Sequence, residues 1–182
     1  GETQLNNTTS TVSNVNRSNF KLNATYDVKL DSVNSIKFTD KTNFYNTESD
    51  EFTNGNTTGN DGLLKNKQEK TFITKSDKES LFASILYKHK FAKARRTFSV
   101  NSSWSTLNTD ANNFLKSSNE SYEGGVFYSR DDVDQNKIGE KTNQNLAVNV
   151  TYTEPIGKKF ALQFAYQVTH NTGESNYLTY DY

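Results

Sequence analysis

The stretch Phe160–Thr169, FALQFAYQVT, decides the fold class of this chain. Every second side chain up to Val168 is large and apolar, and the side chains between them are small or polar. A period of two residues predicts a β-strand with one apolar and one polar face, because successive side chains of a strand point to opposite sides. A helix would scatter the same apolar residues around its whole surface.

The same alternation recurs along the chain, most clearly in Phe20–Leu30 and again in Leu81–Tyr87 and Leu146–Tyr152. Phe20–Leu30 has the length of about 9–11 residues that a tilted strand needs to cross a membrane. Neighbouring runs are expected to pair as antiparallel strands. The sequence therefore predicts an all-β protein, an antiparallel up-and-down meander that is a segment of an outer-membrane β-barrel.

The connections between the expected strands support this class. Short turns are expected at 31–35, 92–96 and 154–159, and long polar loops at 48–69 and 108–141. Short turns on one rim and long loops on the other are typical of outer-membrane barrels.

The distribution of alternating and non-alternating sequence divides the chain into two expected regions. Residues 1–19 are polar and aperiodic, which predicts a disordered lead-in, and residues 20–182 form a single β-barrel domain. No apolar leader follows Gly1, so the chain is expected to be an internal piece of a larger barrel.

Composition excludes several classes. The chain of 182 residues is 32% hydrophobic with a mean hydropathy of −0.88, and it has no apolar run of the roughly 18 residues that a transmembrane helix needs. Barrel strands need only every second residue to be apolar, so this polarity is compatible with a barrel. Basic and acidic residues number 21 each, which gives no basic excess for nucleic acid. Cysteine is absent, which excludes disulfides and thiolate chemistry.

The apolar phase of the clearest strands gives candidate lipid-facing side chains. They are Phe20, Leu22, Tyr26, Val28, Val148, Val150, Phe160, Leu162, Phe164 and Tyr166. The intervening residues, such as Gln163 and Gln167, are expected to face a lumen. Aromatic side chains near the strand ends favour girdles at headgroup depth, although β-propensity alone would also place aromatics in strands.

One residue argues against a membrane strand. Asp40 falls in phase with the apolar residues Ile36, Phe38 and Phe44. A charge on a lipid face costs up to a few kcal/mol at the bilayer centre. A β-bulge that re-aims Asp40 is therefore expected, or else this hairpin belongs to a soluble sheet.

Two motifs resemble a known family. The segments Phe91–Ser99 (FAKARRTFS) and Tyr152–Lys159 (YTEPIGKK) are similar to turns of the outer-membrane β-barrels of Bacteroidota that are related to TonB-dependent receptors. The resemblance implies that Glu154, Pro155, Gly157 and Lys158 form a periplasmic turn. It also implies a parent protein with a plug and further barrel strands. Independently of the family, Pro155 and Gly157 suit a tight turn.

No residue pattern indicates catalysis, so the chain is expected to be no enzyme and to need no cofactor. His89 and His170 have no ligand partners at metal-binding spacing, and Asp131–Asp134 lacks the Gly and Glu of a calcium loop. The leading hypothesis is a barrel segment in the bacterial outer membrane with a structural, passive-transport or receptor role. Its partners would be membrane lipid and the remainder of its barrel and plug, with self-association of the isolated chain. The alternative is a soluble secreted, adhesin-like β-sandwich that binds a partner.

Overall fold

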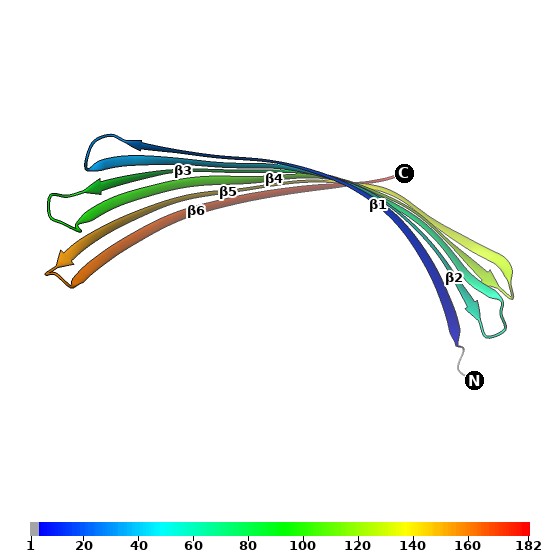
Figure 1. Cartoon of the computed structure of the whole chain (residues 1–182). Helices are drawn as coiled ribbons and strands as arrows, with labels where there is room; N and C mark the ends of the chain where they lie inside the picture. The colour runs from blue at the N-terminus through cyan, green and yellow to red at the C-terminus, as the bar shows by residue number, and fades with distance from the viewer. Residues whose placement is uncertain (1–3) are drawn as a thin grey trace.

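The computed structural model describes residues 4–182, which form one sheet of six antiparallel strands in chain order (Figure 1). The strands are β1 (Leu5–Lys29), β2 (Asn34–Gly59), β3 (Leu64–Lys90), β4 (Thr97–Glu123), β5 (Val126–Ile156) and β6 (Phe160–Asp181). This is the all-β meander that the alternation predicts. In the described range, no helix has the length and apolar character needed to cross a membrane.

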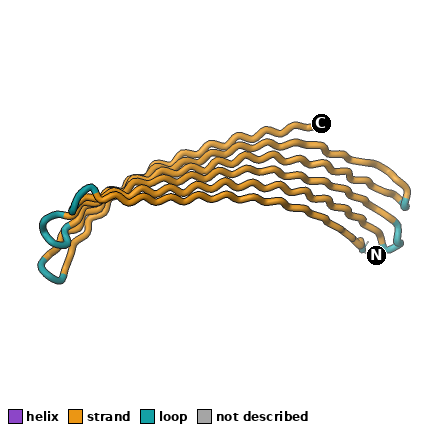
Figure 2. Tube along the Cα trace, turned by 45° about the horizontal axis from the view of Figure 1, so that its top comes forward, coloured by secondary structure: helices purple, strands orange, loops and turns teal. Residues whose placement is uncertain are grey.

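The sheet is a single layer that bends along the direction of its strands (Figure 2). Both faces are open, and no hydrophobic side chain of residues 4–182 is buried. The outer edges of β1 and β6 have no strand partner within this range, so the sheet does not close. Backbone ladders, and not an apolar core, hold the described structure together.

Turns occur near all three predicted places and lie together at one end of the sheet (Figure 1). Their bounds differ from the prediction: the connections are residues 30–33, 91–96 and 157–159, because the strand ladders continue into 34–35 and 154–156. Asp31 shapes the first of them, because its carboxylate accepts hydrogen bonds from the backbone N–H groups of Val33 (2.8 Å) and Asn34 (2.7 Å). Arg95 and Gly157 adopt positive φ angles of 69° and 63° in the other two. We call this end the near rim and the opposite end the far rim.

The long polar loops and the disordered lead-in are wrong predictions. Residues 48–69 and 108–141 belong to paired strands that meet in tight turns at the far rim, and β1 already begins at Leu5. Leu5–Asn19 pairs with Tyr45–Gly59 in unbroken register. The physical reason is that ladder hydrogen bonds need a paired backbone and no particular side chains. Residues 1–3 of the expected lead-in lie outside the described residues.

The bulge expected at Asp40 is also wrong. The register is continuous there, with Asp40 opposite Ala24 on β1 and Ala83 on β3. In the described sheet the register shifts between Thr57 and Thr58 and between Ser121 and Tyr122, both near the far rim. Asp40 therefore stays on the same face as the apolar residues.

Candidate membrane interface

The two faces of the sheet are named after two neighbouring residues of β6, the Phe164 face and the Gln163 face. The strand register places all ten lipid-facing candidates on the Phe164 face. Sequence alternation alone could assign each strand its own apolar side. Only the register shows that these sides coincide across the sheet.

The register adds residues from the central strands that the candidate set lacks. They are Ile36, Phe38, Leu81, Ile85, Tyr87, Val100, Trp104 and Leu146, all on the Phe164 face. One row crosses all six strands with apolar or tyrosine side chains: Val28, Ile36, Tyr87, Val100, Val150 and Tyr166. The alternation of β2, β3 and β4 was the available signal for these residues. We call the whole set, with the ten candidates, the apolar band.

The band runs obliquely across the strands. On β1 it covers Phe20–Val28 with Ala24 at the middle, and on β6 it covers Phe160–Val168 with Phe164 at the middle. The row that starts at Ala24 ends at His170, six residues beyond Phe164. Six residues correspond to about 20 Å along a strand and the five strand spacings to about 24 Å, so the band is inclined by about 40° from the perpendicular to the strands.

The height of the band follows from the same geometry. Nine residues, as in Phe160–Val168, occupy about 30 Å of extended strand, or about 23 Å when the strand is tilted by about 40°. The side chains of the band are uncovered, with exposed fractions of 62% for Phe164 and 71% for Tyr166 on the edge strand and 40% for Trp104 on the central β4. The Phe164 face thus presents a continuous apolar stripe to its surroundings.

Aromatic pairs lie at both borders of the band. Phe20 and Phe44 are 6.3 Å apart between ring centroids at the border toward the far rim. Phe91 and Tyr152 form an edge-to-face pair at 6.1 Å at the border toward the near rim. Phe20 and Phe44 belong to the adjacent strands β1 and β2, whereas Phe91 lies in the β3–β4 turn and Tyr152 on β5. Aromatic rings thus lie at both borders of the band.

Glu154 is the central acceptor of a hydrogen-bonded cluster at the near rim. Its carboxylate accepts two hydrogen bonds from Arg96, at 2.7 Å from Nε and 2.8 Å from Nη2, and one from the hydroxyl of Tyr152 at 2.6 Å. Lys93 Nζ donates to the same carboxylate and to the carbonyl of Pro155. Arg96 first, then Lys93 and Tyr152, hold the pKa of Glu154 well below its usual range.

The four residues of the resembled turn lie together at the near rim. Glu154 and Pro155 belong to the last three residues of β5, paired with Leu162 and Ala161, so their prediction as turn residues is wrong. Gly157 and Lys158 lie in the turn into β6. Arg95 Nη1 donates to the carbonyl of Lys158 at 2.9 Å. The FAKARRTFS and YTEPIGKK turns are therefore joined by side chains, which the sequence did not indicate.

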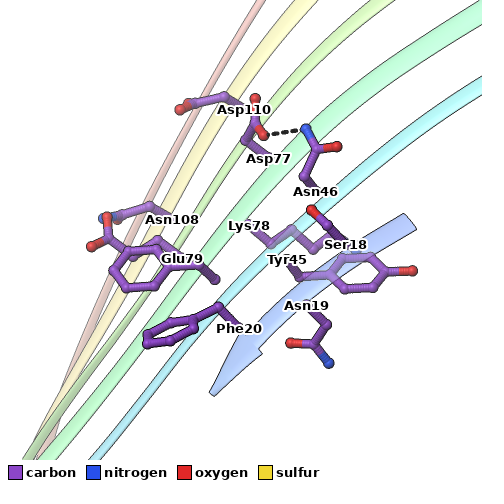
Figure 3. A pocket seen from close by; sticks show the side chains of 11 residues that line it. Ser18, Asn19, Phe20, Tyr45, Asn46, Asp77, Lys78, Glu79, Asn108 and Asp110 are labelled. Atoms are coloured by element: carbon purple, nitrogen blue, oxygen red, sulfur yellow. Dashed lines mark hydrogen bonds between the residues drawn. The ribbon is translucent and has the colours of Figure 1, made fainter. Parts of the chain in front are cut away.

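The opposite border of the band is acidic and hollowed. A shallow hollow of about 400 Å³ lies at this border. Figure 3 shows Phe20 at one end of its lining and Asp77 and Asp110 at the other. The amide of Asn46 donates to Asp77 Oδ1 at 2.7 Å. Asp77, Asp110 and Glu140 lie directly opposite one another on β3, β4 and β5. The apolar band therefore ends at a row of carboxylates.

Charge is unequally divided between the two faces, although the chain as a whole is neutral. The strand carboxylates of the Phe164 face are Asp40, Glu48, Asp50, Glu69, Asp77, Glu79, Asp110, Glu120, Asp132, Asp134, Glu140, Glu154 and Glu174. Regularly paired basic strand residues on that face are Lys67, Lys75, Lys116 and Arg130.

The Gln163 face has the opposite balance. Its basic strand residues are Arg17, Lys21, Lys29, Lys37, Lys41, Lys70, Lys78, Lys88, Lys90, Lys137 and Lys141. Its acidic strand residues are Asp27, Glu51, Asp131 and Asp181. Sequence reasoning missed this segregation, even though the same period of two residues encodes it.

Asp40 is a charged residue within the band. It is half-buried, with the small side chains of Ala24 and Ala83 on either side, and it accepts a hydrogen bond from Thr42 Oγ1 at 3.2 Å. The two alanines leave space around the carboxylate for water or a polar group. The expected alternative, a carboxylate turned to the other face, does not occur.

The histidines and the aspartate run do not form a metal centre. His89 Nδ1 contacts the amide oxygen of Asn34 at 2.7 Å, and His170 lies on a different strand, β6. Asp132 pairs with Arg130 and Asp134 with Lys116. Among residues 4–182, no three His, Asp or Glu side chains gather in an arrangement that could hold a metal ion.

Comparison with known proteins gives no family. No family model and no curated protein matches the chain. Among solved structures, the translocator domain of the autotransporter NalP from Neisseria meningitidis aligns over 92% of this chain and 88% of its own, with 9% identity and a TM-score of 0.14. A FadL homologue from Pseudomonas aeruginosa aligns over 92% and 68%, with 6% identity and a TM-score of 0.15. These overlaps are too small to support an argument, so the function is inferred from the chain's own geometry.

Proposed function

We propose that this chain is a segment of the wall of a bacterial outer-membrane β-barrel with a transport or receptor role. The observation on which the proposal rests is the oblique apolar band. Its inclination of about 40° matches the strand tilt of about 35–45° in such barrels, and its height of about 23 Å is close to their apolar belt of about 25 Å.

In such a barrel wall, the two faces of the sheet contact different surroundings. The Phe164 face contacts lipid through the apolar band, and the Gln163 face contacts a water-filled lumen. Lipid contact accounts for large apolar side chains that are exposed, because exposed apolar patches beyond a few hundred Å² are rare on soluble monomers. The amide and hydroxyl side chains of the Gln163 face remain hydrated.

The position of the band along the strands also indicates which rim faces the periplasm. The band lies close to the near rim, and the strands continue beyond it toward the far rim as paired, largely polar sheet with scattered apolar residues. Strands of 22–31 residues exceed the about 9–11 residues needed to cross a bilayer. The near rim is thus periplasmic, as the resemblance implies for Glu154, Pro155, Gly157 and Lys158, and the long polar part of the wall extends outside the cell.

The free edges of β1 and β6 require partners in this proposal. Unpaired edges invite pairing with further strands. In the intact barrel these are other strands of the same wall, around a plug if the resemblance to relatives of TonB-dependent receptors holds. An isolated sheet would need detergent or would associate with other copies through its edges and its apolar band.

Solvent access at two adjacent residues of β6 tests the proposal. In cells that carry the full-length protein, Gln163→Cys should react with a small water-soluble thiol reagent. Phe164→Cys should resist the reagent, and a fluorophore attached there should be quenched by lipid-embedded quenchers. The two positions share strand, depth and rim distance, so each is the control of the other.

Equal aqueous labelling of both variants would reject the membrane proposal. The adhesin-like soluble module would then be the better account. Asp40 is the observation that favours this second candidate, because a carboxylate on the apolar face is ordinary on a wet sheet and costly in lipid.

A further inference from the structure

The Gln163 face has a basic strip at the level of the apolar band. Six lysines of β1, β2 and β3 form it: Lys21, Lys29, Lys37, Lys41, Lys78 and Lys88. These strands run side by side, and Lys29 and Lys88 share one row through Ser35. Asp27 is the one carboxylate among them in the described strands.

Most of these ammonium groups have no carboxylate partner. Within residues 4–182, the only ion pair of the strip joins Lys37 to Asp27, at 3.8 Å. The Nζ of Lys41 lies 5.8 Å from the centroid of the Phe82 ring, which is on the same face. All six side chains are exposed, so a solute that moves along this face can reach them.

The neighbouring strands provide neutral hydrogen-bonding groups at the same level. On the Gln163 face, β4, β5 and β6 present Ser99, Asn101, Asn149, Thr151, Gln163 and Gln167. Hydroxyl and amide groups donate to anionic oxygens without adding charge. The Gln163 face therefore has a positively charged surface on β1–β3 and a neutral, hydrogen-bonding surface on β4–β6.

Structural need does not account for the strip. In the register of the described strands, none of the six lysines lies opposite a carboxylate except Lys37, and the other carboxylates at this level, such as Asp40 and Glu79, lie on the Phe164 face. A surface of one sign raises the local concentration of solutes of the opposite sign. We propose that the Gln163 face of β1–β3 binds and guides small solutes that bear several negative charges, such as polyphosphates, polycarboxylates or sulfonates. As a guiding path this rests on the proposed function, because it requires that the face line a lumen.

The probe for the binding test is pyranine, a pyrene with three sulfonate groups, and the readout is its fluorescence anisotropy with the full chain in nonionic detergent. We expect binding that weakens as salt is added. The variant Lys21→Gln/Lys41→Gln/Lys78→Gln should bind about tenfold more weakly.

The matched control is Lys67→Gln/Lys75→Gln/Lys116→Gln on the Phe164 face, which removes the same charge and should bind within about twofold of the unmodified chain. Both variants change exposed or half-exposed lysines, and circular dichroism checks that the sheet is retained. Absence of dye binding, or an equal loss in both variants, overturns the inference.

Planar-bilayer recording of the full-length protein, in which the remaining strands can close the barrel, separates this inference from the proposed function. Pores that prefer Cl⁻ over K⁺ in a KCl gradient, and lose that preference in the Lys21/Lys41/Lys78 variant, support both. Pores that prefer K⁺ overturn the basic strip as a selectivity element and leave the barrel proposal standing. Absence of pores contradicts the transport role of this chain, and the pyranine measurement then decides the strip alone.

Discussion

The half of the sheet next to the near rim and the half toward the far rim have the same strand backbone and different side chains. In the first half, as in Phe160–Val168, apolar and polar residues alternate strictly. In the second half, as in Leu5–Arg17 paired with Thr47–Gly59, large apolar residues such as Val12 and Phe52 are sparse among polar ones, and the ladder continues without interruption. The difference teaches that alternation reports what the two faces contact, whereas strand structure depends on pairing with a neighbour.

The largest expected effect tests the apolar face of the first half. Phe164→Arg places a charge near the middle of the band and should reduce the free energy of unfolding from lipid vesicles by about 2–4 kcal/mol. Gln163→Arg, one residue away on the wet face, should change it by less than about 1 kcal/mol. Denaturant titration of vesicle-embedded protein measures both. Similar losses for the two variants would mean that the faces do not differ in solvent.

The next effect concerns the carboxylate within the band. Asp40→Leu removes a charge between Ala24 and Ala83 and should stabilise the vesicle-embedded protein by up to about 2 kcal/mol. The control is Asp50→Leu on the same face of β2 in the second half, where water is the solvent and no stabilisation is expected. A loss of stability in Asp40→Leu would show instead that the carboxylate serves a polar partner in the band.

A smaller effect tests whether the second half folds as a local unit. Gly125 has a φ of 82° in the β4–β5 turn at the far rim, so Gly125→Val should cost about 1–2 kcal/mol. Amide hydrogen exchange should accelerate around this turn and stay unchanged at Val148–Tyr152. Ser129→Val, in the extended part of β5, is the control. Faster exchange throughout β5 would mean that the two halves unfold together.

The smallest effect is at the near rim, where Glu154→Gln breaks the hydrogen-bonded ion pair with Arg96. A carboxyl with a depressed folded pKa contributes stability above its ordinary pKa of about 4.3 and loses the contribution as the pH falls through its lower folded pKa. Thermal unfolding should therefore show a larger acid-induced loss in the unmodified protein than in Glu154→Gln. Glu174→Gln, whose carboxylate has an amide partner in Asn176, should behave like the unmodified protein. The pair is exposed and screened by water, so the difference should be modest.

The comparison of the two halves also explains which parts of the fold and of the membrane interface the sequence could predict. The alternation of Phe20–Leu30 and Phe160–Thr169 predicted strands, their apolar faces and the near-rim turns. The second half was assigned to loops because its polar side chains have no period that a buried face would impose. The oblique band and the basic strip could not be predicted from single strands, since both depend on the register between strands, which hairpin geometry sets.

In residues 4–182, each strand contacts only the strand before it and the strand after it. Such a sheet is a one-dimensional array whose units are hairpins, so its energetics are those of neighbouring pairs, as in repeat proteins. Addition or loss of one hairpin leaves every other pairing intact. A wall of this kind can lengthen its circumference by gene duplication of about 60 residues at a time, and each added hairpin brings its own strip of lipid-facing and lumen-facing side chains.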